Sequence, residues 1–472
     1  MITIVNITAY LLFIGVTGYY FITNLQWYSY RLERVIFHHT KTWWHFVYFL
    51  IPFVLYEFVS VVTDKKFGFV IVLLYLPLFF HWVRGLDKKL VFTGRVKRFF
   101  AALYLFAVFI ALAFHFYSIF IPIILAYAAS MLIEKMLFEG FRRKAEKRLE
   151  SMNDMIVVGV TASYGKTSIK NFIAHLLAKK YKVYATPRSV NTFGGVLKDI
   201  NEDLPDDTEV YVVEMGARGE GDIAEIATFV NPHYAVVGKI GPAHIEYFRT
   251  LENIRNTKME ILRSDRLREA WVDQSAKIKP TDTIHMFGQD VKEVKATLES
   301  TSFTLDEVRY HASILGAFNA MNLAAAVKVA KALGLSDGEI QEGLQSLEPV
   351  PHRLQRIDAG GKVILDDSFN GNIDGMLASF DLAATYPGRK VIITPGLVEA
   401  DEDLNIQVAK RANEVFDLII VTGDLNYAIF KEQIDPDKLR KLGSKDKMEE
   451  MLVTETTAGD LILFANDAPS FI

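Results

Sequence analysis

The sequence predicts an α-helical membrane domain with several spans, followed by two α/β domains. Hydrophobic residues make up 51% of the 472 residues, and their excess is confined to the first third of the chain, in long apolar runs. After about residue 150, strand-like and helical segments alternate. A glycine-containing loop joins the first of these strands to a helix. We therefore expect a transmembrane domain at 1–140, a central α/β domain at 141–348 and a C-terminal α/β domain at 349–472.

The apolar runs predict five membrane spans. The runs at 5–22, 44–62 and 67–83 each have about the length that crosses a bilayer. The run at 99–133 is too long for one span, and a polar break at 115–118 divides it into two short ones. A cleavable signal peptide is the alternative for the first run, but that run lacks a basic start and a small-residue cleavage site.

Basic residues indicate the orientation of the spans. The segments 24–43, 84–98 and 135–148 are rich in Lys and Arg. Placing them in the cytoplasm puts the N-terminus outside and the α/β domains in the cytoplasm, so we expect a multi-pass protein of the cytoplasmic membrane. Glu57 lies inside the second span. We interpret it as an interfacial residue rather than part of a polar pathway, because the other spans carry almost no charge.

The periodicity of apolar residues and the local composition predict the strands and helices of the α/β region. Strands are expected at 155–161, 182–185, 209–214 and 234–238, and in the C-terminal domain at 362–366, 390–394, 418–422 and 460–464. Helices are expected at 166–179, 221–230, 318–333 and 336–347. The last helix opens with Ser336 and Glu339, the spacing of a capping box.

Composition excludes some classes of function. The chain has no cysteine, which rules out disulfides, thiolate metal sites and cysteine nucleophiles. Its formal net charge of −4 gives no sign of nucleic-acid binding, so we expect no nucleic acid among its partners.

Residues 159–168, Gly-Val-Thr-Ala-Ser-Tyr-Gly-Lys-Thr-Ser, predict a phosphate-binding loop between a strand and a helix. Backbone amides at such a loop attract phosphate oxygens, Lys166 would reach the terminal phosphates of ATP, and Thr167 would bind magnesium. The strict pattern has a glycine where this chain has Val160. The nucleotide contacts that we expect here are Ser163, Gly165, Lys166, Thr167 and Ser168.

Further motifs occur in the order found in Mur ligases. They lie at 186–195, 214–217, 240–244, 258–261, 319–322, 352–353 and 366–370. From about residue 155 to its end, the chain therefore resembles that family of ATP-dependent amide ligases of peptidoglycan precursor synthesis, and especially its D-alanyl-D-alanine-adding member. The resemblance implies a central P-loop ATPase domain and a Rossmann-like C-terminal domain.

The resemblance also implies a reaction and a set of site residues. A carboxylate is phosphorylated by ATP, and an amine attacks the acyl phosphate. The implied catalytic residues are Lys166, Glu214, His244 and Lys258, and the implied ligands of two magnesium ions are Thr167, Glu214, His244 and Lys258. A protonated lysine would repel a metal, and the resemblance implies that Lys258 is carbamylated. The other implied nucleotide contacts are Asn319 and Asn322, which suit recognition of the adenine edge, and Arg353 and Asp367.

The chain departs from the family at several positions. Ala162 replaces a loop glycine, Phe318 replaces a histidine, and residues 465–467 replace the Lys-Gly-Ser segment near the incoming amine. Nothing matches the domain that holds uridine diphosphate, and the apolar runs occupy its place. We therefore expect a membrane-borne, lipid-linked carboxylate acceptor, with an amino acid or a dipeptide as the amine.

The sequence thus favours a membrane-anchored ligase in cell-envelope synthesis. One alternative is a poly-γ-glutamate-type polymer ligase, whose products would form a ladder of sizes. Another is a nucleotide-binding scaffold without catalysis, which the complete set of site residues disfavours. An amidating Mur-like enzyme is disfavoured because it would carry a cysteine-rich insert. A transport ATPase is disfavoured by the lack of charge in the spans.

Overall fold

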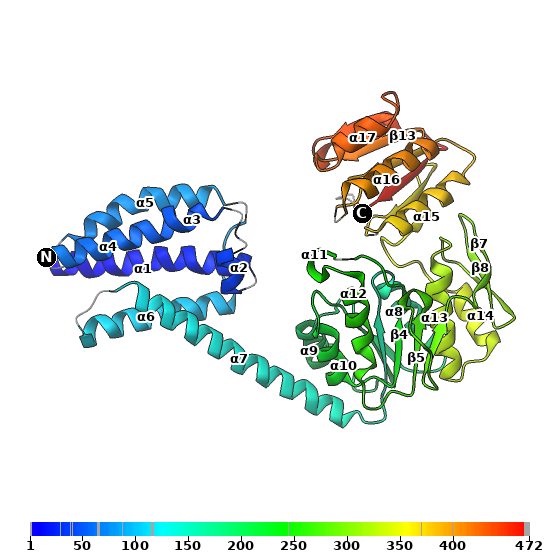
Figure 1. Cartoon of the computed structure of the whole chain (residues 1–472), viewed down its shortest axis with the longest axis horizontal. Coiled ribbons are helices and arrows are strands. Elements are labelled where there is room, and N and C mark those ends of the chain that lie inside the picture. The colour runs from blue at the N-terminus through cyan, green and yellow to red at the C-terminus, as the bar shows by residue number, and fades with distance from the viewer. Residues whose placement is uncertain are drawn as a thin grey trace. The chain divides into compact units, whose positions relative to one another are not determined.

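The computed structural model describes residues 2–28, 30–37, 39, 41–63, 67–86, 88–114, 118–243, 245–369, 371–398 and 400–466. The chain divides into two compact units, Met1–Arg143 and Lys144–Ile472. Figure 1 shows helices in the first unit and alternating helices and strands in the second.

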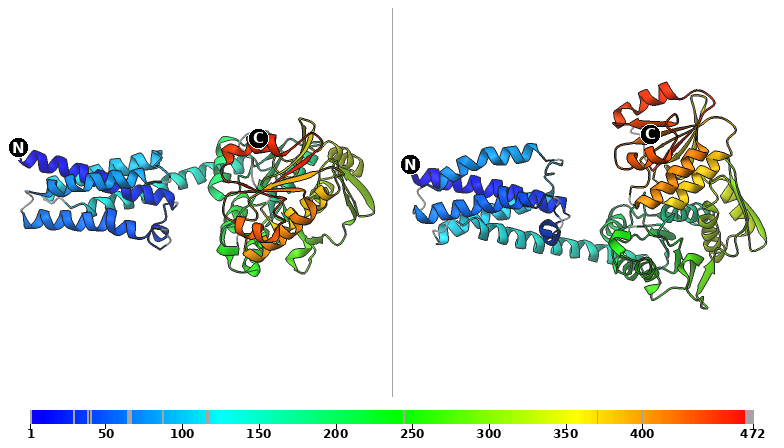
Figure 2. Two further views of the ribbon diagram at one scale, coloured as in Figure 1. Left: turned by 90° about the horizontal axis from the view of Figure 1, so that it is seen from above. Right: turned by 45° about the horizontal axis from the view of Figure 1, so that its top comes forward.

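The first unit is a bundle of apolar helices. Its helical segments are α1 (Ile2–Trp27), α2 (Leu32–Phe37), α3 (Trp43–His45), η1 (Phe46–Leu50), α4 (Ile51–Val62), α5 (Gly68–Arg84), α6 (Gly94–Phe114) and the first part of α7 (Phe120–Ser151), which continues into the second unit. Helix α1 packs against α5 and α6, and α4 packs against α5. Both views of Figure 2 show these long helices side by side.

Four helical stretches among the described residues are long and apolar enough to cross a membrane: 5–27, 43–62, 94–113 and 120–151. Helix α5 is apolar but shorter. The two spans expected within 99–133 correspond to two separate helices, α6 and α7, which extend beyond this range from Gly94 and to Ser151. The polar break predicted at 115–118 does separate them, although 115–117 lie outside the described residues.

Apolar side chains fill the inside of this bundle and also cover much of its outside. Phe13 and Phe99 are fully buried, whereas Leu74 and Leu112 are 70% and 73% exposed. A helical bundle with so many apolar side chains on its outside suits a lipid environment. Glu57 accepts a hydrogen bond of 3.0 Å from the backbone N–H of Ile119, just before α7 begins. Its carboxylate therefore caps a helix start, where negative charge is favourable.

The second unit begins with a six-stranded parallel sheet. Its strands are β1 (Ile156–Thr161), β2 (Val183–Ala185), β3 (Val210–Glu214), β4 (Tyr234–Val237), β5 (Glu269–Asp273) and β6 (Ile284–Phe287), in the order β2-β3-β1-β4-β5-β6. The helices are α8 (Lys166–Leu177), α9 (Phe193–Glu202), α10 (Asp222–Val230), α11 (Ile245–Phe248), α12 (Leu251–Met259), α13 (Asn319–Ala332) and α14 (Asp337–Gln345).

Helices cover both faces of this sheet. Figure 1 shows α9, α10 and α12 on one side, and α8, α13 and α14 on the other. Helix α13 packs on α8, and their apolar faces share one core with Val158 and Val212 of the sheet. Parallel strands are buried on both faces, which explains why β1 and β3 are almost continuously apolar.

Two further sheets complete the unit. A small antiparallel sheet contains β7 (Lys292–Ala296), β8 (Thr301–Leu305) and β9 (Val308–Ala312). The last sheet contains β10 (Gln355–Ala359), β11 (Lys362–Asp367), β12 (Lys390–Thr394), β13 (Leu418–Thr422), β14 (Leu439–Leu442) and β15 (Leu461–Ala465), in the order β10-β11-β15-β12-β13-β14. Only β10 is antiparallel to its neighbour there. Helices α15 (Ile373–Ala384), α16 (Glu402–Val415), α17 (Tyr427–Gln433) and α18 (Met448–Glu455) alternate with these strands.

The predicted elements of the α/β region agree with the structure to within two residues at nearly every boundary. The capping box of α14 is confirmed: Ser336 Oγ accepts from the N–H of Glu339, and Glu339 Oε2 accepts from the N–H of Ser336. The prediction missed strands β5 to β10 and β14, and helices α9, α11, α12 and α15 to α18.

Candidate nucleotide and metal site

The candidate site lies where three neighbouring parallel strands end. Strand β1 pairs with β3 on one side and with β4 on the other, with Val160 opposite Glu214. The chain leaves β1 for the phosphate-binding loop at residues 162–165. Ligands of open α/β sheets bind at this carboxyl edge, at the point where strand order reverses. The site is therefore at the position that the fold favours.

Close contacts fix the conformation of the phosphate-binding loop. Gly165 has a φ of 80° and is the N-cap of α8. A Cβ at this position would lie 2.6 Å from Asn322 Oδ1. Ser163 Oγ donates a hydrogen bond of 2.9 Å to Gly241 O. Glycine is required at residue 165 both by the left-handed backbone and by the space.

The side chain of Lys166 folds over the same loop. Its Nζ donates to the carbonyls of Ala162 and Ser163 at 3.0 and 3.2 Å. Burial lowers the pKa of Lys166, the carboxylate of Glu214 opposes this effect, and the guanidinium of Arg353 adds to it. The ammonium thus has two neutral acceptors, which a phosphate oxygen with full negative charge would replace favourably.

Glu214 and Thr167 offer adjacent oxygen atoms. Thr167 Oγ1 donates to Glu214 Oε2 at 3.0 Å, and Asn191 Nδ2 donates to Glu214 Oε1 at 3.0 Å. Glu214 is 1% exposed. A hydroxyl and a carboxylate are ligands that Mg²⁺ accepts. Among the described residues no cluster of three or more His, Asp or Glu forms a complete metal site, and His244 lies outside them.

A buried lysine that the sequence analysis did not single out holds Glu214 in place. Lys170 Nζ lies 3.5 Å from Glu214 Oε2, and both side chains are almost fully buried. The same ammonium donates to the carbonyls of Thr186 and Arg188, each at 2.6 Å. Burial lowers the pKa of Lys170, whereas Glu214 and Asp199 oppose this effect.

Asp199 extends this buried network. The hydroxyls of Tyr184 and Tyr211 donate to its two carboxylate oxygens, each at 2.6 Å. Burial raises the pKa of Asp199, whereas the two tyrosines and Lys170 lower it. The spacing of Lys170 from Lys166 places it one turn further along α8, and this is the only sequence signal that could have suggested its role.

Replacing Lys170 with methionine is expected to lower the free energy of unfolding by about 3 kcal/mol, because it leaves buried carboxylates without their cation. Urea unfolding of the purified protein measures the change. Lys182→Met is the matched control: Lys182 forms an exposed ion pair with Asp207, so its loss should leave stability close to that of the unmodified protein. Equal stability of the two variants would contradict this role of Lys170.

Lys258 lies near the end of α12 and is 3% exposed. Its amine has no hydrogen-bond or ion-pair partner within the described part of the chain. Burial and the charge of Lys166 lower the pKa of Lys258 to about 7, although Asp222 and Glu260 raise it. A large fraction of this lysine is therefore uncharged at neutral pH, the form in which an amine can react with carbon dioxide.

The acidic neighbours of Lys258 accept hydrogen bonds from backbone N–H groups elsewhere. Glu260 accepts from the backbone N–H groups of Gly221 and Ala224 at 2.8 and 3.0 Å, at the start of α10. Asp222 Oδ2 accepts from the N–H groups of Arg218 and Gly219. Both carboxylates thus have backbone partners, and the structure gives neither of them an ion pair with Lys258.

The two asparagines that we expect to bind adenine form a hydrogen bond with each other. Asn322 Nδ2 donates to Asn319 Oδ1 at 2.9 Å, and Asn319 Nδ2 donates to Leu315 O at 2.7 Å. Asn319 is 2% exposed and Asn322 is 8% exposed. In this arrangement they brace the glycine of the phosphate-binding loop. Their contact with adenine stays a prediction.

Arg353 and Asp367 come from the part of the unit that contains the last sheet. Arg353 donates to the carbonyl of Phe369 and lies between His352 and Leu354, both of which have positive φ (63° and 53°). Such φ values are uncommon outside glycine and cluster at functional sites. Burial lowers the pKa of Arg353, and the nearby charges of Asp367 and Glu214 oppose this effect.

Other contacts hold the backbone around Arg353 and Asp367. His352 Nδ1 is 2.7 Å from Asp366 Oδ2, and the N–H of Phe369 donates to His352 O. Asp367, at the end of β11, is 1% exposed. The charges of Asp367 and Glu214 thus both act on Arg353, and the nucleotide contacts of Arg353 and Asp367 stay predictions.

The segment that replaces the family's Lys-Gly-Ser is only partly described. Asn466 Nδ2 donates to Gly396 O at 2.8 Å, and its N–H donates to Asp367 O. Gly396 has a φ of 77°, and a Cβ there would lie 2.6 Å from Asn405 Oδ1. Asn466 therefore joins the turn after β12 to the end of β11, while Asp467 lies outside the described residues.

Comparison with known proteins identifies relatives of the second unit. Residues 160–330 match the profile of the Mur ligase middle domain. The UDP-N-acetylmuramoyl-tripeptide–D-alanyl-D-alanine ligase of Synechocystis sp. is 31% identical over 52% of this chain and 55% of that protein. The ligase of the same name from Bacillus subtilis is 27% identical over 65% of this chain and 72% of that protein. The chain thus spans between about half and three quarters of the length of these relatives.

A solved structure gives the same result for the fold. The MurF ligase from Thermotoga maritima in complex with ADP has a TM-score of 0.59 and 26% sequence identity, over 69% of this chain and 80% of that one. These matches agree with the resemblance drawn from the sequence motifs, and they confirm the α/β architecture expected from it.

Proposed function

We propose that the chain, whose second unit is similar to Mur ligases of the MurF type, is a membrane-anchored, ATP-dependent ligase that joins a carboxylate to an amine. The observation that carries this proposal is the geometry at one edge of the central sheet. There the loop lysine Lys166, the buried carboxylate Glu214 and the buried Lys258, whose pKa is lowered to about 7, occur together. A site that only binds nucleotide has no need of a buried, unpaired lysine.

The reaction that suits these groups passes through an acyl phosphate. An oxygen of the acceptor carboxylate attacks the terminal phosphorus of ATP, and ADP leaves. The amine then attacks the acyl carbon, phosphate leaves with one of the former carboxylate oxygens, and a proton is released. The products are an amide, ADP and phosphate. Activation is needed because a free carboxylate is a poor electrophile, and alignment of the reactants supplies much of the rate.

The residues have distinct parts in this proposal. Lys166 and the loop amides would neutralise the charge of the transferred phosphoryl group, and Arg353 would add a second cation. Thr167 and Glu214 would hold one magnesium ion, and His244 with carbamylated Lys258 would hold a second. Bound magnesium supplies Lewis acidity at the phosphates. Asn319, Asn322 and Asp367 would contact the nucleoside.

Carbamylation of Lys258 fits the surroundings of its side chain. The neutral amine adds to the carbon of carbon dioxide, and loss of a proton leaves an anionic carbamate. This change turns a buried cation beside Lys166 into a buried anion, which removes a repulsion and creates a metal ligand. Lys166 would then have a favourable partner at Lys258.

The acceptor is proposed to be membrane-borne. Support comes from the apolar helices of the first unit, four of which have the length and composition of membrane spans. The relatives act, by name, on a UDP-linked muramoyl tripeptide and D-alanyl-D-alanine. We propose that the acceptor here is a lipid-linked sugar-peptide, with an amino acid or a dipeptide as the amine. The ATP-binding unit would lie in the cytoplasm and the N-terminus outside.

An assay of ADP release tests this function. Purified protein in detergent is given ATP with soluble or lipid-linked acceptors, each with D-alanyl-D-alanine or single amino acids. We expect ADP release only when acceptor and amine are both present, together with one discrete gain in acceptor mass. A ladder of products would indicate polymer synthesis instead. Equal turnover of soluble and lipid-linked acceptors would contradict the membrane-borne acceptor, and no ADP release under any condition would contradict the ligase.

A further inference from the structure

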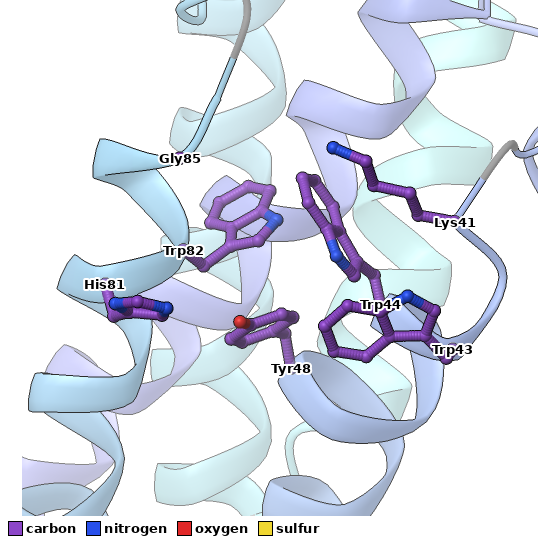
Figure 3. A pocket seen from close by; sticks show the side chains of 7 residues that line it. All are labelled: Lys41, Trp43, Trp44, Tyr48, His81, Trp82 and Gly85. Carbon is purple, nitrogen blue, oxygen red and sulfur yellow. The ribbon is translucent and has the colours of Figure 1, made fainter.

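The first unit contains a cavity of about 280 Å³ between the start of α3 and the end of α5. Figure 3 shows the side chains around it. Those that matter for its chemistry are Lys41, Trp43, Trp44, Tyr48, His81 and Trp82. None of these residues takes part in the nucleotide site, and the family match begins far beyond them, at residue 160.

The walls of this cavity are aromatic. The ring centroids of Trp44 and Trp82 are 6.2 Å apart at an interplanar angle of 81°, and Tyr48 lies 5.9 and 6.3 Å from them. These three side chains are at most 6% exposed, whereas Trp43 is 54% exposed. The buried rings form the walls of the pocket, and Trp43 is its exposed aromatic residue.

Two hydrogen-bond donors border the cavity. Trp82 is 1% exposed, and its indole N–H has no partner within the residues that the structure describes. In Figure 3 the indole nitrogen is on the side of the ring that faces Trp44 and Lys41. A buried donor without an acceptor costs roughly 1–3 kcal/mol. An acceptor atom from a ligand would remove this cost.

The second donor is the ammonium of Lys41. Its Nζ lies 4.6 Å from the ring centroid of Trp44, and it has no carboxylate partner in the described part of the chain. Aromatic walls alone would suit a quaternary ammonium, but Lys41 already occupies the face of Trp44 and would repel such a ligand. A free cation and an unpaired N–H around one cavity call for an anion with oxygen acceptors.

The surroundings of the cavity indicate that this anion is carried by a lipid. Leu73 and Leu74 of α5 and Phe46 of η1 are more than half exposed. The cavity therefore lies at one end of helices whose outer faces are apolar. Tryptophan and tyrosine are enriched at the membrane–water boundary, where lipid headgroups lie. Basic side chains continue beyond it at Arg84.

We propose that this cavity binds the phosphate-ester headgroup of a lipid, with Lys41 and the indole N–H of Trp82 donating to phosphate oxygens. The hydrocarbon chain would extend along the exposed apolar side chains. This inference rests on the proposed function in one respect, which is that the bound lipid is the one that carries the acceptor. Binding itself can be measured without catalysis.

Tryptophan fluorescence of the full-length protein in a neutral detergent tests the proposal, since three of the five tryptophans line the cavity. The probe is farnesyl phosphate, which joins a phosphate monoester to an apolar chain. Farnesol carries the chain without phosphate, and inorganic phosphate carries the anion without the chain. We expect saturable binding of farnesyl phosphate, and at least about tenfold weaker binding of either part.

Matched variants locate the binding. Trp82→Phe and Lys41→Gln should each raise the dissociation constant about tenfold, the effect of losing a hydrogen bond to a charged group. Trp27→Phe and Lys88→Gln, which change one tryptophan and one lysine outside the cavity, should leave it unchanged. Thermal unfolding checks that each variant is folded. Unchanged binding in folded Trp82→Phe, or equal binding of farnesol, would overturn the proposal.

The outcomes also separate this inference from the proposed function. If Trp82→Phe still ligates a lipid-linked acceptor with an unchanged KM, the cavity is not the acceptor site and the ligase proposal stands. If farnesyl phosphate binds as expected but no acceptor is ligated, the ligase proposal fails and the lipid site stands.

Discussion

Replacing Lys166 with alanine is expected to reduce ATP turnover by about 100- to 1,000-fold or more, because the transferred phosphoryl group loses its closest cation. The side chain lies over the phosphate-binding loop and makes its only hydrogen bonds, among the described residues, with the carbonyls of Ala162 and Ser163. Its loss therefore leaves the fold intact. ADP release in the presence of acceptor and amine measures the effect.

A lysine outside the site provides the control for this variant. Lys182→Ala removes an exposed lysine that pairs with Asp207 at 2.9 Å, and it should keep full turnover. Full activity in Lys166→Ala would contradict the assignment of the loop. Equal loss of activity in both variants would point to a general effect of charge instead.

Replacing Lys258 with methionine is expected to abolish ligation and to stabilise the protein. Methionine has a similar length and volume but cannot carry a carbamate, so a metal ligand is lost and turnover should fall at least about 100-fold. In buffer depleted of carbon dioxide, Lys258 of the unmodified protein cannot be carbamylated. Folding then buries its amine, which would be protonated in the unfolded chain, and this burial costs stability. The melting temperature of the variant should then be higher by about 2 °C or more.

The stability gain of Lys258→Met should depend on pH in a defined direction. Burial lowers the pKa of Lys258 from 10.5 to about 7. Below pH 7 both states are protonated, and the folded state bears the full cost of the buried charge. Between pH 7 and about 10 the folded state has lost the proton that the unfolded state keeps, so this cost shrinks as pH rises. The gain should be largest at or below pH 7 and should fade toward pH 10.

Two measurements check this prediction. Melting curves from pH 6 to pH 10, with and without bicarbonate, follow the difference between Lys258→Met and the unmodified protein. Lys198→Met is the control, because Lys198 forms only an exposed ion pair with Glu202. A gain that grows with pH, or full ligase activity in Lys258→Met, would contradict the role assigned to Lys258.

The sequence predicted the site elements that follow from local pattern. A run of β-branched residues predicts strand β1, the glycine-containing segment after it predicts the loop, and helical periodicity predicts α8. Strand β3 ends at Glu214, as expected. The positions of Lys166, Thr167 and Glu214 could be predicted because parallel strands end at the same edge of a sheet. Nothing in the comparisons tests the roles of these residues individually, and they stay predictions.

Other contacts could not be predicted because they join residues far apart in the chain. Lys170 reaches Glu214 from one turn beyond the loop, and only burial distinguishes it from a surface lysine on α8. The pairing of Asn322 with Asn319 and its approach to Gly165 likewise depend on how α13 packs on α8. His244 lies outside the described residues, so its expected metal contact has no structural account here.

Two of the missed strands lack the pattern that predicts a strand. Strand β7 is mostly exposed and contains three charged residues, so it lacks the alternation of a half-buried strand. Strand β10 has no buried residue and pairs only at the edge of its sheet. Helices α6 and α7 were shortened in the prediction because the charged segments at their ends resemble loops. In the structure these charges are helical, and Arg98 pairs with Glu134 across the two helices.

The central claim is that ATP activates a carboxylate, and an isotope measurement tests it directly. The acceptor is labelled with oxygen-18 in its carboxylate and incubated with ATP, the amine and the purified protein, and the released phosphate is analysed by mass spectrometry. An acyl phosphate predicts one labelled oxygen in each phosphate released, in step with amide formation. Unlabelled phosphate alongside the amide product, or release of AMP and pyrophosphate, would contradict the account.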